Sequence, residues 1–506
     1  MSANSTPGPQ ARENAGKETY DSAYALRVMI ILASLVTLVL YVEGMLTPSL
    51  PTIAKEFSIT SGQASLILSS YIITGVALSP IVGKLGDIYG KKKLLGIVIV
   101  VYAACVSVTG FSPSYSFMVA ARAFQGVGLT IFPLGISLVR EEFPRAMVPR
   151  AQGFLSAMFG AGFAISLPIG AWVSNTYGWR STYHSAIPFV VLLAILVFLF
   201  VRESKYRRPD SKVDYVGASV LGMALALIVL ALSEGATWGW LSTPTLGLFG
   251  VGGALLIPLV LYERRYQRTA SEAILDFRLL RQRNVMVTNL VGAVSGFGMF
   301  LALLSMTYLF QDPTVAGGYG KDILGAGLSL VPLAIGMLIF AAIAGTLVSR
   351  LGTRPMTAIG SAITGLGFLL AIPAQPLESL LAVEFLIGAG IGITNAGMIN
   401  LLVLTVNPRD MGLATSMSAV FRNVGSSLGA PLSGSLLATY TISVLGFGFP
   451  SRVAFEWSFA LAAIAFAFAG GFMIFGREVL GRHAVPRAGE LSPSPAPSLS
   501  EPLSDP

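Results

Sequence analysis

Apolar runs of membrane-spanning length recur along most of this chain, and short polar breaks separate them. A helix that crosses a bilayer needs roughly 20 consecutive apolar residues. Charged residues make up 11% of the chain, whereas soluble domains average about 25%. These features exclude a single water-soluble fold and predict an all-α, polytopic membrane protein. The fourteen predicted transmembrane helices lie near residues 27–48, 64–83, 94–112, 116–139, 152–173, 184–202, 214–233, 245–263, 286–310, 322–348, 356–373, 379–405, 411–439 and 454–476.

The two ends of the chain lack such runs. Residues 1–26 are polar and have neither the apolar core nor the small-residue cleavage site of a signal peptide, so we expect a disordered cytoplasmic leader. Residues 477–506 are rich in Pro and Ser and are predicted to form a disordered cytoplasmic tail.

The basic residues predict the orientation. Of the 33 Lys and Arg residues, 27 lie in the two ends and in the breaks on their side, four lie in the opposite loops, and two lie within predicted helices. Lys and Arg concentrate in cytoplasmic loops. We therefore expect a multi-pass protein of the cell membrane with both termini in the cytoplasm. The net charge of +8 follows from these loops and does not indicate a nucleic-acid partner.

Two motifs recur at a shared spacing of 262 positions: residues 83–90 match residues 345–352, and residues 122–128 match residues 384–390. A common offset predicts a tandem repeat. The predicted parts are an N-terminal six-helix bundle (27–202), a linker with two extra transmembrane helices (203–285) and a C-terminal six-helix bundle (286–476). Repeats of this kind, with a site near mid-membrane at their interface, are typical of secondary transporters.

Several of these segments resemble a known family. GKLGDIYGKKK at 83–93, RAFQGVG at 122–128 and GWRSTY at 178–183 resemble signature motifs of the major facilitator superfamily. DYVG at 214–217 and ILDFRLLRQRN at 274–284 are similar to its fourteen-helix drug–proton antiporter branch. The resemblance implies the major facilitator fold and proton-coupled export of small, lipophilic or cationic compounds by alternating access.

The GKLGDIYGKKK segment is predicted to join the second and third helices on the cytoplasmic side. Gly83 and Gly90 permit a tight turn, Asp87 supplies a negative charge, and Lys91 begins a basic run that meets anionic headgroups. The resemblance implies that this segment is a latch that holds the two halves together in the outward-facing state. Its physical form would be Asp87 docked on the positive N-terminal end of a helix near residues 407–412. The alternative is an ordinary cytoplasmic loop.

Glu43 and Arg122 are charges within predicted helices, where each is costly unless it is paired or hydrated. Glu43 lies about 16 residues from the cytoplasmic end of its helix and Arg122 about six from the outer end of another, or ~24 Å and ~9 Å along them. Both therefore fall in the outer third of a core about 30 Å thick, where an ion pair is possible. We hypothesise that Glu43 carries the exchangeable proton and that Arg122 tunes its pKa. The alternatives are a hydrated Glu43 near the outer mouth and a structural Arg122 that binds carbonyl groups.

The substrate cavity has five candidate residues. Glu384 occupies the repeat position of Arg122 with the opposite charge, and Asn395 lies eleven residues further on the same helical face. Arg422 lies in the middle of its helix, where either Glu384 or an anionic substrate can neutralise it. Tyr41 and Gln125 are the remaining candidates, and helix packing is the alternative for both.

The sequence shows no metal-ligand cluster, no nucleophile with a partnered base and no phosphate-binding loop. We therefore expect no enzyme and no cofactor, with the proton gradient as the energy source. The expected partners are a small-molecule substrate, protons and the lipid bilayer, and we expect a monomer. A proton-coupled symporter for a small metabolite and a transporter-like membrane sensor are the alternative functions.

Overall fold

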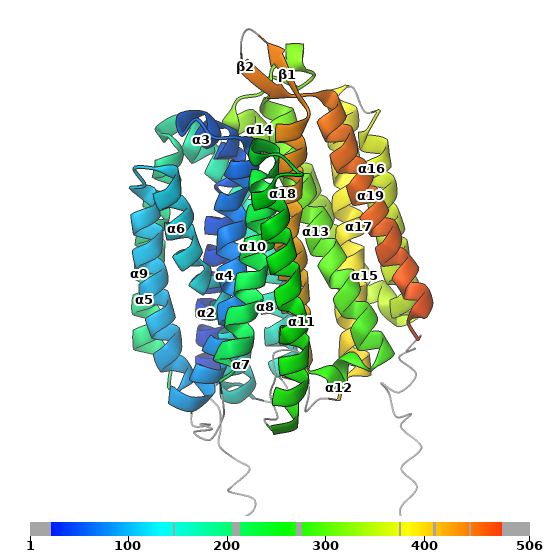
Figure 1. Ribbon diagram of the computed structural model, residues 1–506. Coiled ribbons are helices and arrows are strands. Elements are labelled where there is room, and N and C mark those ends of the chain that lie inside the picture. Colours follow the sequence, from blue (N-terminus) through cyan, green and yellow to red (C-terminus); the bar gives the residue numbers. More distant parts are fainter. Residues whose placement is uncertain are drawn as a thin grey trace, which may run out of the picture.

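The computed structural model describes residues 22–144, 147–204, 213–269, 276–373, 376–407, 411–444 and 447–477. Long helices run side by side along one axis, and a small β-hairpin lies at one end (Figure 1). We call this end the hairpin end, and we call the opposite end the basic end because most of the loop Lys and Arg residues lie there. The orientation predicted from these residues places the hairpin end outside the cell.

The N-terminal half contains six helical columns, two of which are interrupted or extended by short helices. Its elements are α2 (Ser22–Gly44), η1 (Thr47–Ser49), α3 (Leu50–Glu56), α4 (Ser61–Tyr89), α5 (Lys91–Gly110), α6 (Tyr115–Gln125), η2 (Gly126–Thr130), α7 (Ile131–Glu142), α8 (Val148–Tyr177) and α9 (Trp179–Phe200). The helix α2 begins at Ser22, so the predicted leader is too long by five residues. Tyr24 and Ala25 are buried, which explains why this stretch joins the helix.

The linker and the C-terminal half complete the bundle. The linker elements are α10 (Tyr215–Trp238), α11 (Thr243–Thr269) and α12 (Phe277–Leu280). The C-terminal half contains α13 (Arg283–Gln311), η3 (Thr314–Ala316), α14 (Ile323–Ser329), α15 (Val331–Leu351), α16 (Thr353–Ala371), α17 (Leu377–Thr405), α18 (Met411–Thr439), β1 (Thr441–Val444), β2 (Phe447–Pro450) and α19 (Arg452–Phe475). The antiparallel pair β1–β2, with Thr441 opposite Pro450, is an addition to the predicted all-α fold.

Eleven helical segments of the described chain are long and apolar enough to cross a membrane. The helices α8, α16 and α18 match three further predicted ranges but are not among these eleven. The structure therefore supports a multi-pass, helical membrane protein, and the number of fourteen crossings stays a prediction.

Three of the predicted helices are broken at residues that disturb the helical hydrogen-bond ladder. The first ends at Gly44, and Pro48 starts the 3-10 turn η1 that follows it. The fourth becomes a 3-10 turn from Gly126 to Thr130. The tenth breaks at Leu330, directly before an α15 that has Pro332 in its first turn. Proline lacks the backbone N–H that a continuous helix needs, so the first and the tenth of these breaks have a local cause.

The two halves meet at the hairpin end. The Ser61 hydroxyl of α4 donates to the Gly434 carbonyl of α18 over 2.9 Å, and the Gln311 side chain of α13 donates to the Pro48 carbonyl over 2.7 Å. A β-carbon on Gly434 would lie 2.5 Å from the Ser61 carbonyl oxygen, so the two helices approach as closely as a glycine allows. These contacts form an outer seal between the halves.

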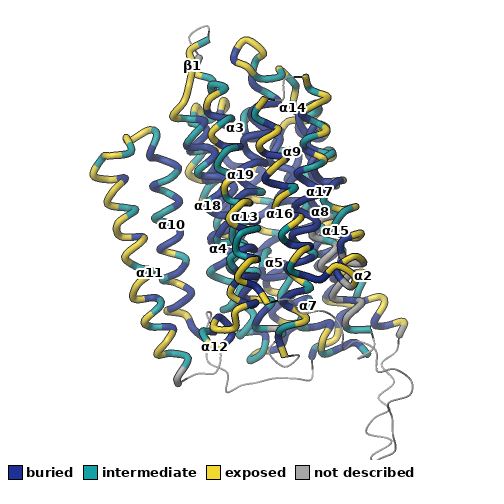
Figure 2. Tube along the Cα trace, turned by 90° about the vertical axis from the view of Figure 1, so that its right-hand side faces the viewer, coloured by how far each residue is buried: buried dark blue, intermediate teal, exposed yellow. Residues whose placement is uncertain are grey.

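The linker helices lie on one flank of the bundle. Helix α10 packs against both α4 and α18, whereas α11 packs mainly against α10. Figure 2 shows α10 with a buried inner face and α11 with an exposed outer face. At the hairpin end the Gln63 amide donates to the Glu234 carboxylate of α10 over 3.1 Å, and the Trp240 indole donates to Thr439 over 3.2 Å. The linker is therefore bonded to both halves.

Candidate functional site

A group of three charges lies inside the bundle, where α2, α6 and α18 contribute one side chain each. Glu43 is 5% exposed and Arg122 is fully buried. The charges of Arg122 and of Arg422 both act on the Glu43 carboxylate. Arg122 belongs to the same half as Glu43, and Arg422 belongs to the other half. Glu43 is thus a carboxylate that interacts with positive charge on both sides of the interface.

Arg122 and Glu43, for which the sequence allows an ion pair, form none in this structure. The Arg122 Nε donates to the Ile67 carbonyl of α4 over 3.0 Å, and its guanidinium stacks on the Tyr71 ring, 4.6 Å from the ring centroid. Within the described chain, its two terminal nitrogens have no hydrogen-bond partner. The carbonyl and the aromatic ring fix the guanidinium in place, so it acts on Glu43 through space and not by direct contact.

Three buried tyrosines surround this pair. Tyr71, Tyr102 and Tyr183 are at most 1% exposed, and among the described residues their hydroxyl groups have no hydrogen-bond partner. Tyr71 and Tyr102 interact electrostatically with both Glu43 and Arg122.

Two of the predicted cavity residues lie in different places. Gln125 is fully buried and accepts a long hydrogen bond, 3.4 Å, from the Thr109 hydroxyl of α5. It ends α6 directly before η2, beside the buried tyrosines. Tyr41 is half-buried and lies near Ser185 of α9. It is two residues from Glu43, so it lies on a different face of α2, and the structure does not bring it to the charged group.

Glu384 was one of two partners considered for Arg422, and a pairing between them stays a prediction. The charge of Glu43 acts on Arg422. Glu384 is fully buried in α17, and neither of its oxygens has a hydrogen-bond partner within the described chain. Asn395, half-buried on the same helix, accepts from the Ser295 hydroxyl of α13 at 3.4 Å. The repeat position of Glu384 therefore did not predict which carboxylate interacts with Arg422.

The predicted latch is more helical than expected. Helix α4 continues to Tyr89, so Gly83 and Asp87 lie within a helix and Gly90 alone makes the turn into α5, with φ 110°. Positive φ of this kind favours glycine. A β-carbon on Gly90 would also lie 2.7 Å from the Glu203 carboxylate, whereas one on Gly83 would meet nothing within 4 Å.

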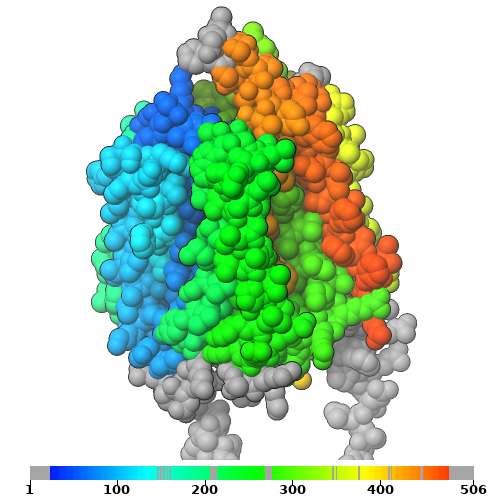
Figure 3. Space-filling view, viewed as in Figure 1, coloured from blue at the N-terminus to red at the C-terminus, as the bar shows by residue number. Residues whose placement is uncertain are grey.

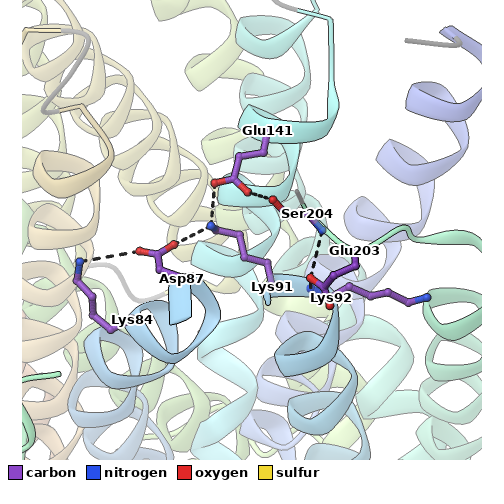
Figure 4. A network of polar contacts seen from close by, with 7 residues as sticks. All are labelled: Lys84, Asp87, Lys91, Lys92, Glu141, Glu203 and Ser204. Atoms are coloured by element: carbon purple, nitrogen blue, oxygen red, sulfur yellow. Dashed lines mark hydrogen bonds and ion pairs between the residues drawn. The ribbon is translucent and has the colours of Figure 1, made fainter. Parts of the chain in front are cut away.

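Asp87 forms its ion pairs within its own half, as Figure 4 shows. Lys91 Nζ lies 2.6 Å from Asp87 and 2.7 Å from Glu141 of α7, and Lys84 lies 3.9 Å from Asp87. Lys91 is almost fully buried, so it links the end of α4 to the end of α7. In a conformation with a closed hairpin end, Asp87 is thus neutralised by lysines of its own half.

The start of α5 is capped by Glu203, the first residue of the linker. The Glu203 carboxylate accepts from the backbone N–H groups of Lys92 and Lys93, each at 3.0 Å. A carboxylate at a helix N-terminus satisfies free N–H groups and interacts favourably with the helix dipole. The neighbouring Ser204 donates to Glu141, so the beginning of the linker is bonded to the latch network (Figure 4).

A further titratable group lies at the outer seal. Asp312 directly follows Gln311, is 6% exposed, and has one carboxylate oxygen without a hydrogen-bond partner among the described residues. The loop that follows folds back over it, because the Gly320 N–H donates to the Asp312 carbonyl over 2.8 Å. Burial raises the pKa of Asp312 to about 7.

Some of these residues were missed by the sequence analysis. Tyr71, Tyr102 and Glu203 lie in ordinary helical or loop positions that no motif singles out, and Tyr183 ends the GWRSTY motif but was not chosen as a site residue. Polar side chains in the middle of apolar runs, such as Tyr71 and Tyr102, are a usable signal because their hydroxyl groups need a partner. Glu203 had no such signal, since its role depends on where α5 begins.

A comparison with protein families matches the Major Facilitator Superfamily over residues 32–313 and 288–506. The chain belongs to this family. Its members are membrane transporters, not enzymes, and the family implies a small-molecule substrate. Solved structures support the same fold at low sequence identity. The human organic anion transporter MFSD10 is 14% identical with a TM-score of 0.60, covering 89% of this chain and 99% of that one. A bacterial homologue of the human lysosomal transporter Spinster is 13% identical with a TM-score of 0.61, covering 90% and 95%.

Curated relatives are more similar in sequence. An uncharacterised MFS-type transporter of Mycobacterium tuberculosis is 30% identical over 415 residues, which is 80% of this chain and 58% of that protein. The chain therefore spans a little over half the length of that relative. The multidrug transporter protein MdtP of Bacillus subtilis is 25% identical, covering 73% of this chain and 68% of that protein. The multidrug resistance protein Stp of Mycobacterium tuberculosis is 25% identical, covering 78% and 73%.

Proposed function

We propose that this major facilitator protein exports small lipophilic compounds in exchange for protons, by alternating access of one central site. The observation that carries the proposal is that the charges of Arg122, in the same half, and of Arg422, in the other half, both act on the buried Glu43. The names of MdtP and Stp, both multidrug proteins, support the class of cargo.

Proton coupling follows from the charges of this site. When Glu43 is ionised, it attracts Arg422 and so holds the two halves together at this depth. When Glu43 is protonated, this attraction ends and the two arginines repel each other across the interface. The protonation state of one carboxyl therefore biases the arrangement of the halves, which is the requirement for a proton-driven conformational change.

The charges of this site also influence which compounds it accepts. Two arginines and one carboxylate leave the site with net positive charge even when Glu43 is ionised. A cation must compete with both guanidinium groups for Glu43, whereas a neutral lipophilic molecule does not. We therefore propose that neutral lipophilic compounds are favoured over cations.

The latch has a place in the same cycle. The outer seal is closed in this structure, and Asp87 pairs with Lys84 and Lys91. We propose that Asp87 leaves these lysines for the N-terminal end of α18 when the hairpin end opens, while Lys91 keeps Glu141. Gly83, which has open space beside it, then allows the close approach of the other half.

Transport by purified protein in liposomes tests the proposal. A pH gradient is imposed in either direction, and the movement of one neutral and one cationic fluorescent lipophilic compound is followed. We expect the neutral compound to move against the proton flow. Movement in the direction of the proton flow would establish a symporter instead, and no gradient-dependent movement of any compound would favour a membrane sensor.

Substitution of Glu43 tests the role of the site. Glu43→Gln keeps the size and hydrogen-bonding capacity of the side chain but cannot release a proton. We expect gradient-driven transport to fall to the level of protein-free liposomes while exchange of labelled for unlabelled compound persists without a gradient. Glu378→Gln, which removes an exposed carboxylate at the hairpin end of α17, is the matched control. Full gradient-driven transport by Glu43→Gln would refute the assignment of the proton to this residue.

A further inference from the structure

A cavity of about 680 Å³ lies where the basic end of α11 meets α12 and the start of α13. It is far along the chain from the charged group around Glu43, and the proposed transport cycle does not use it. Its lining residues are Arg264, Gln267, Phe277, Leu280, Arg281 and Met286. Two guanidinium groups and three apolar side chains therefore face one space, and none of these six residues carries a negative charge.

Hydrogen bonds fix the walls of this cavity. The Gln267 amide donates to Asp276 over 2.6 Å, and its carbonyl accepts from the Phe277 N–H at 3.2 Å. Asp276 also caps α12 by accepting from the Leu279 N–H. The Arg264 guanidinium lies over the Phe277 ring, 5.3 Å from its centroid. The end of α11 and the helix α12 are thus held together, with Arg264 oriented at the cavity wall.

The position of the cavity indicates what can reach it. It lies at the basic end, where the membrane-spanning helices α11 and α13 end and begin. This is the level of the lipid headgroups, and the predicted orientation makes it the cytoplasmic leaflet. Anionic lipids of this leaflet attract basic side chains, and basic pockets between transmembrane helices are sites for their headgroups.

A furrow leads from the cavity into the membrane. Figure 3 shows the surface hollowed between α11 (green) and α19 (orange-red), above α12. Helix α11 packs mainly against α10, and its outward side chains, such as Ile257 and Leu261, are more than half exposed. Within a bilayer these outward apolar side chains contact hydrocarbon.

We propose that this cavity binds an anionic glycerophospholipid, with the phosphate between Arg264 and Arg281 and an acyl chain in the furrow beside α11. A soluble anion would leave Phe277, Leu280 and Met286 without an apolar partner. A lipophilic cation would be repelled by the two guanidinium groups. The bound lipid fills the space between the linker helix and the C-terminal half. The inference is independent of proton coupling and of the exported compound.

The binding experiment compares two double variants of equal charge. Arg264→Gln with Arg281→Gln removes the lining charges, and Arg265→Gln with Arg283→Gln removes two exposed charges next to them that do not line the cavity. Binding of phosphatidylglycerol and of phosphatidylcholine to the purified full chain is measured by native mass spectrometry. Roughly 1 kcal/mol for each basic side chain near the membrane predicts a loss of phosphatidylglycerol affinity of about thirtyfold in the first variant. We expect less than a threefold loss in the second variant.

Three results would overturn the proposal. Equal losses in both double variants would show a general effect of surface charge. Equal binding of phosphatidylcholine and phosphatidylglycerol by the unaltered protein would remove the role of the two arginines. Displacement of phosphatidylglycerol by millimolar inorganic phosphate would identify the site as one for a free anion.

A second measurement uses the unaltered protein and does not depend on the folding of any variant. Phosphatidylglycerol with a photoreactive group near its headgroup is added in nanodiscs and cross-linked by light, and the modified peptides are identified. We expect modification within residues 264–286. Modification elsewhere alone would refute the proposed position.

Discussion

The buried carboxyl of Asp312 makes the stability of the closed conformation dependent on pH. Burial raises the pKa of Asp312 from 3.8 to about 7, so the folded, closed form binds a proton that a hydrated Asp312 releases. Below about pH 4 the carboxyl is protonated in both forms and does not change their relative stability. As the pH rises from about 4 to 7, the closed form loses stability progressively, and above about 7 the loss is complete.

The size of this effect follows from the difference between the two pKa values. At 1.36 kcal/mol per pKa unit, the shift corresponds to a ceiling of ~4 kcal/mol. Asp312→Asn keeps the shape of the side chain and cannot ionise. We therefore expect the variant to match the unaltered protein near pH 4 and to exceed its stability increasingly toward pH 7, with a constant difference at higher pH.

Thermal unfolding of the detergent-solubilised protein from pH 4 to pH 8 measures this difference as a change in Tm. Asp322→Asn is the control, because Asp322 lies on the same loop but is exposed, where it caps α14 through the Gly325 N–H. We expect its effect on Tm to be the same at every pH. A stability difference for Asp312→Asn that does not change with pH, or that is largest near pH 4, would refute the reasoning.

Four further predictions concern the local surroundings of single residues. Lys91→Ala breaks a nearly buried bridge between two carboxylates, so we expect a loss of roughly 3 kcal/mol of stability, whereas the exposed Lys93→Ala should change the Tm little. Gly90→Ala places a methyl group on a residue with positive φ and against the Glu203 carboxylate. We therefore expect no well-folded product, as judged by size-exclusion chromatography. Gly83→Ala should leave Tm unchanged or slightly raised, since a helical glycine with free space costs about 1 kcal/mol, while transport falls if the latch requires close approach. Arg122→Met should abolish gradient-driven transport in liposomes, and normal transport would contradict a role of its charge.

The sequence predicted the helices better than their interruptions. Apolar runs define where a helix can cross, because every backbone group in lipid must be bonded within the segment. The break at Gly126 depends on how one helix packs on another. A β-carbon on Gly128, for example, would lie 2.4 Å from the Tyr102 ring, and no pattern within one segment reveals such an approach.

The charged site, too, was predicted from the sequence only in part. Depth along the helices predicted Glu43 and Arg122 at one level, and the charge of Arg122 acts on the buried Glu43. This depth did not reveal that the Ile67 carbonyl binds the guanidinium, nor that the charge of Glu43 acts on Arg422. These choices depend on the rotation of each helix about its axis, which is set by packing against neighbours from distant parts of the chain.

The attachment of the linker helix α10 to both halves has a consequence for how the molecule can move. Contacts at Gln63 and Thr439 join the linker to both halves on one flank of the hairpin end. If the two halves rocked freely, these contacts would have to break in every transport cycle. If these contacts persist, the halves must instead open about a hinge beside α10. The cargo then leaves through the side farthest from α10 and α11.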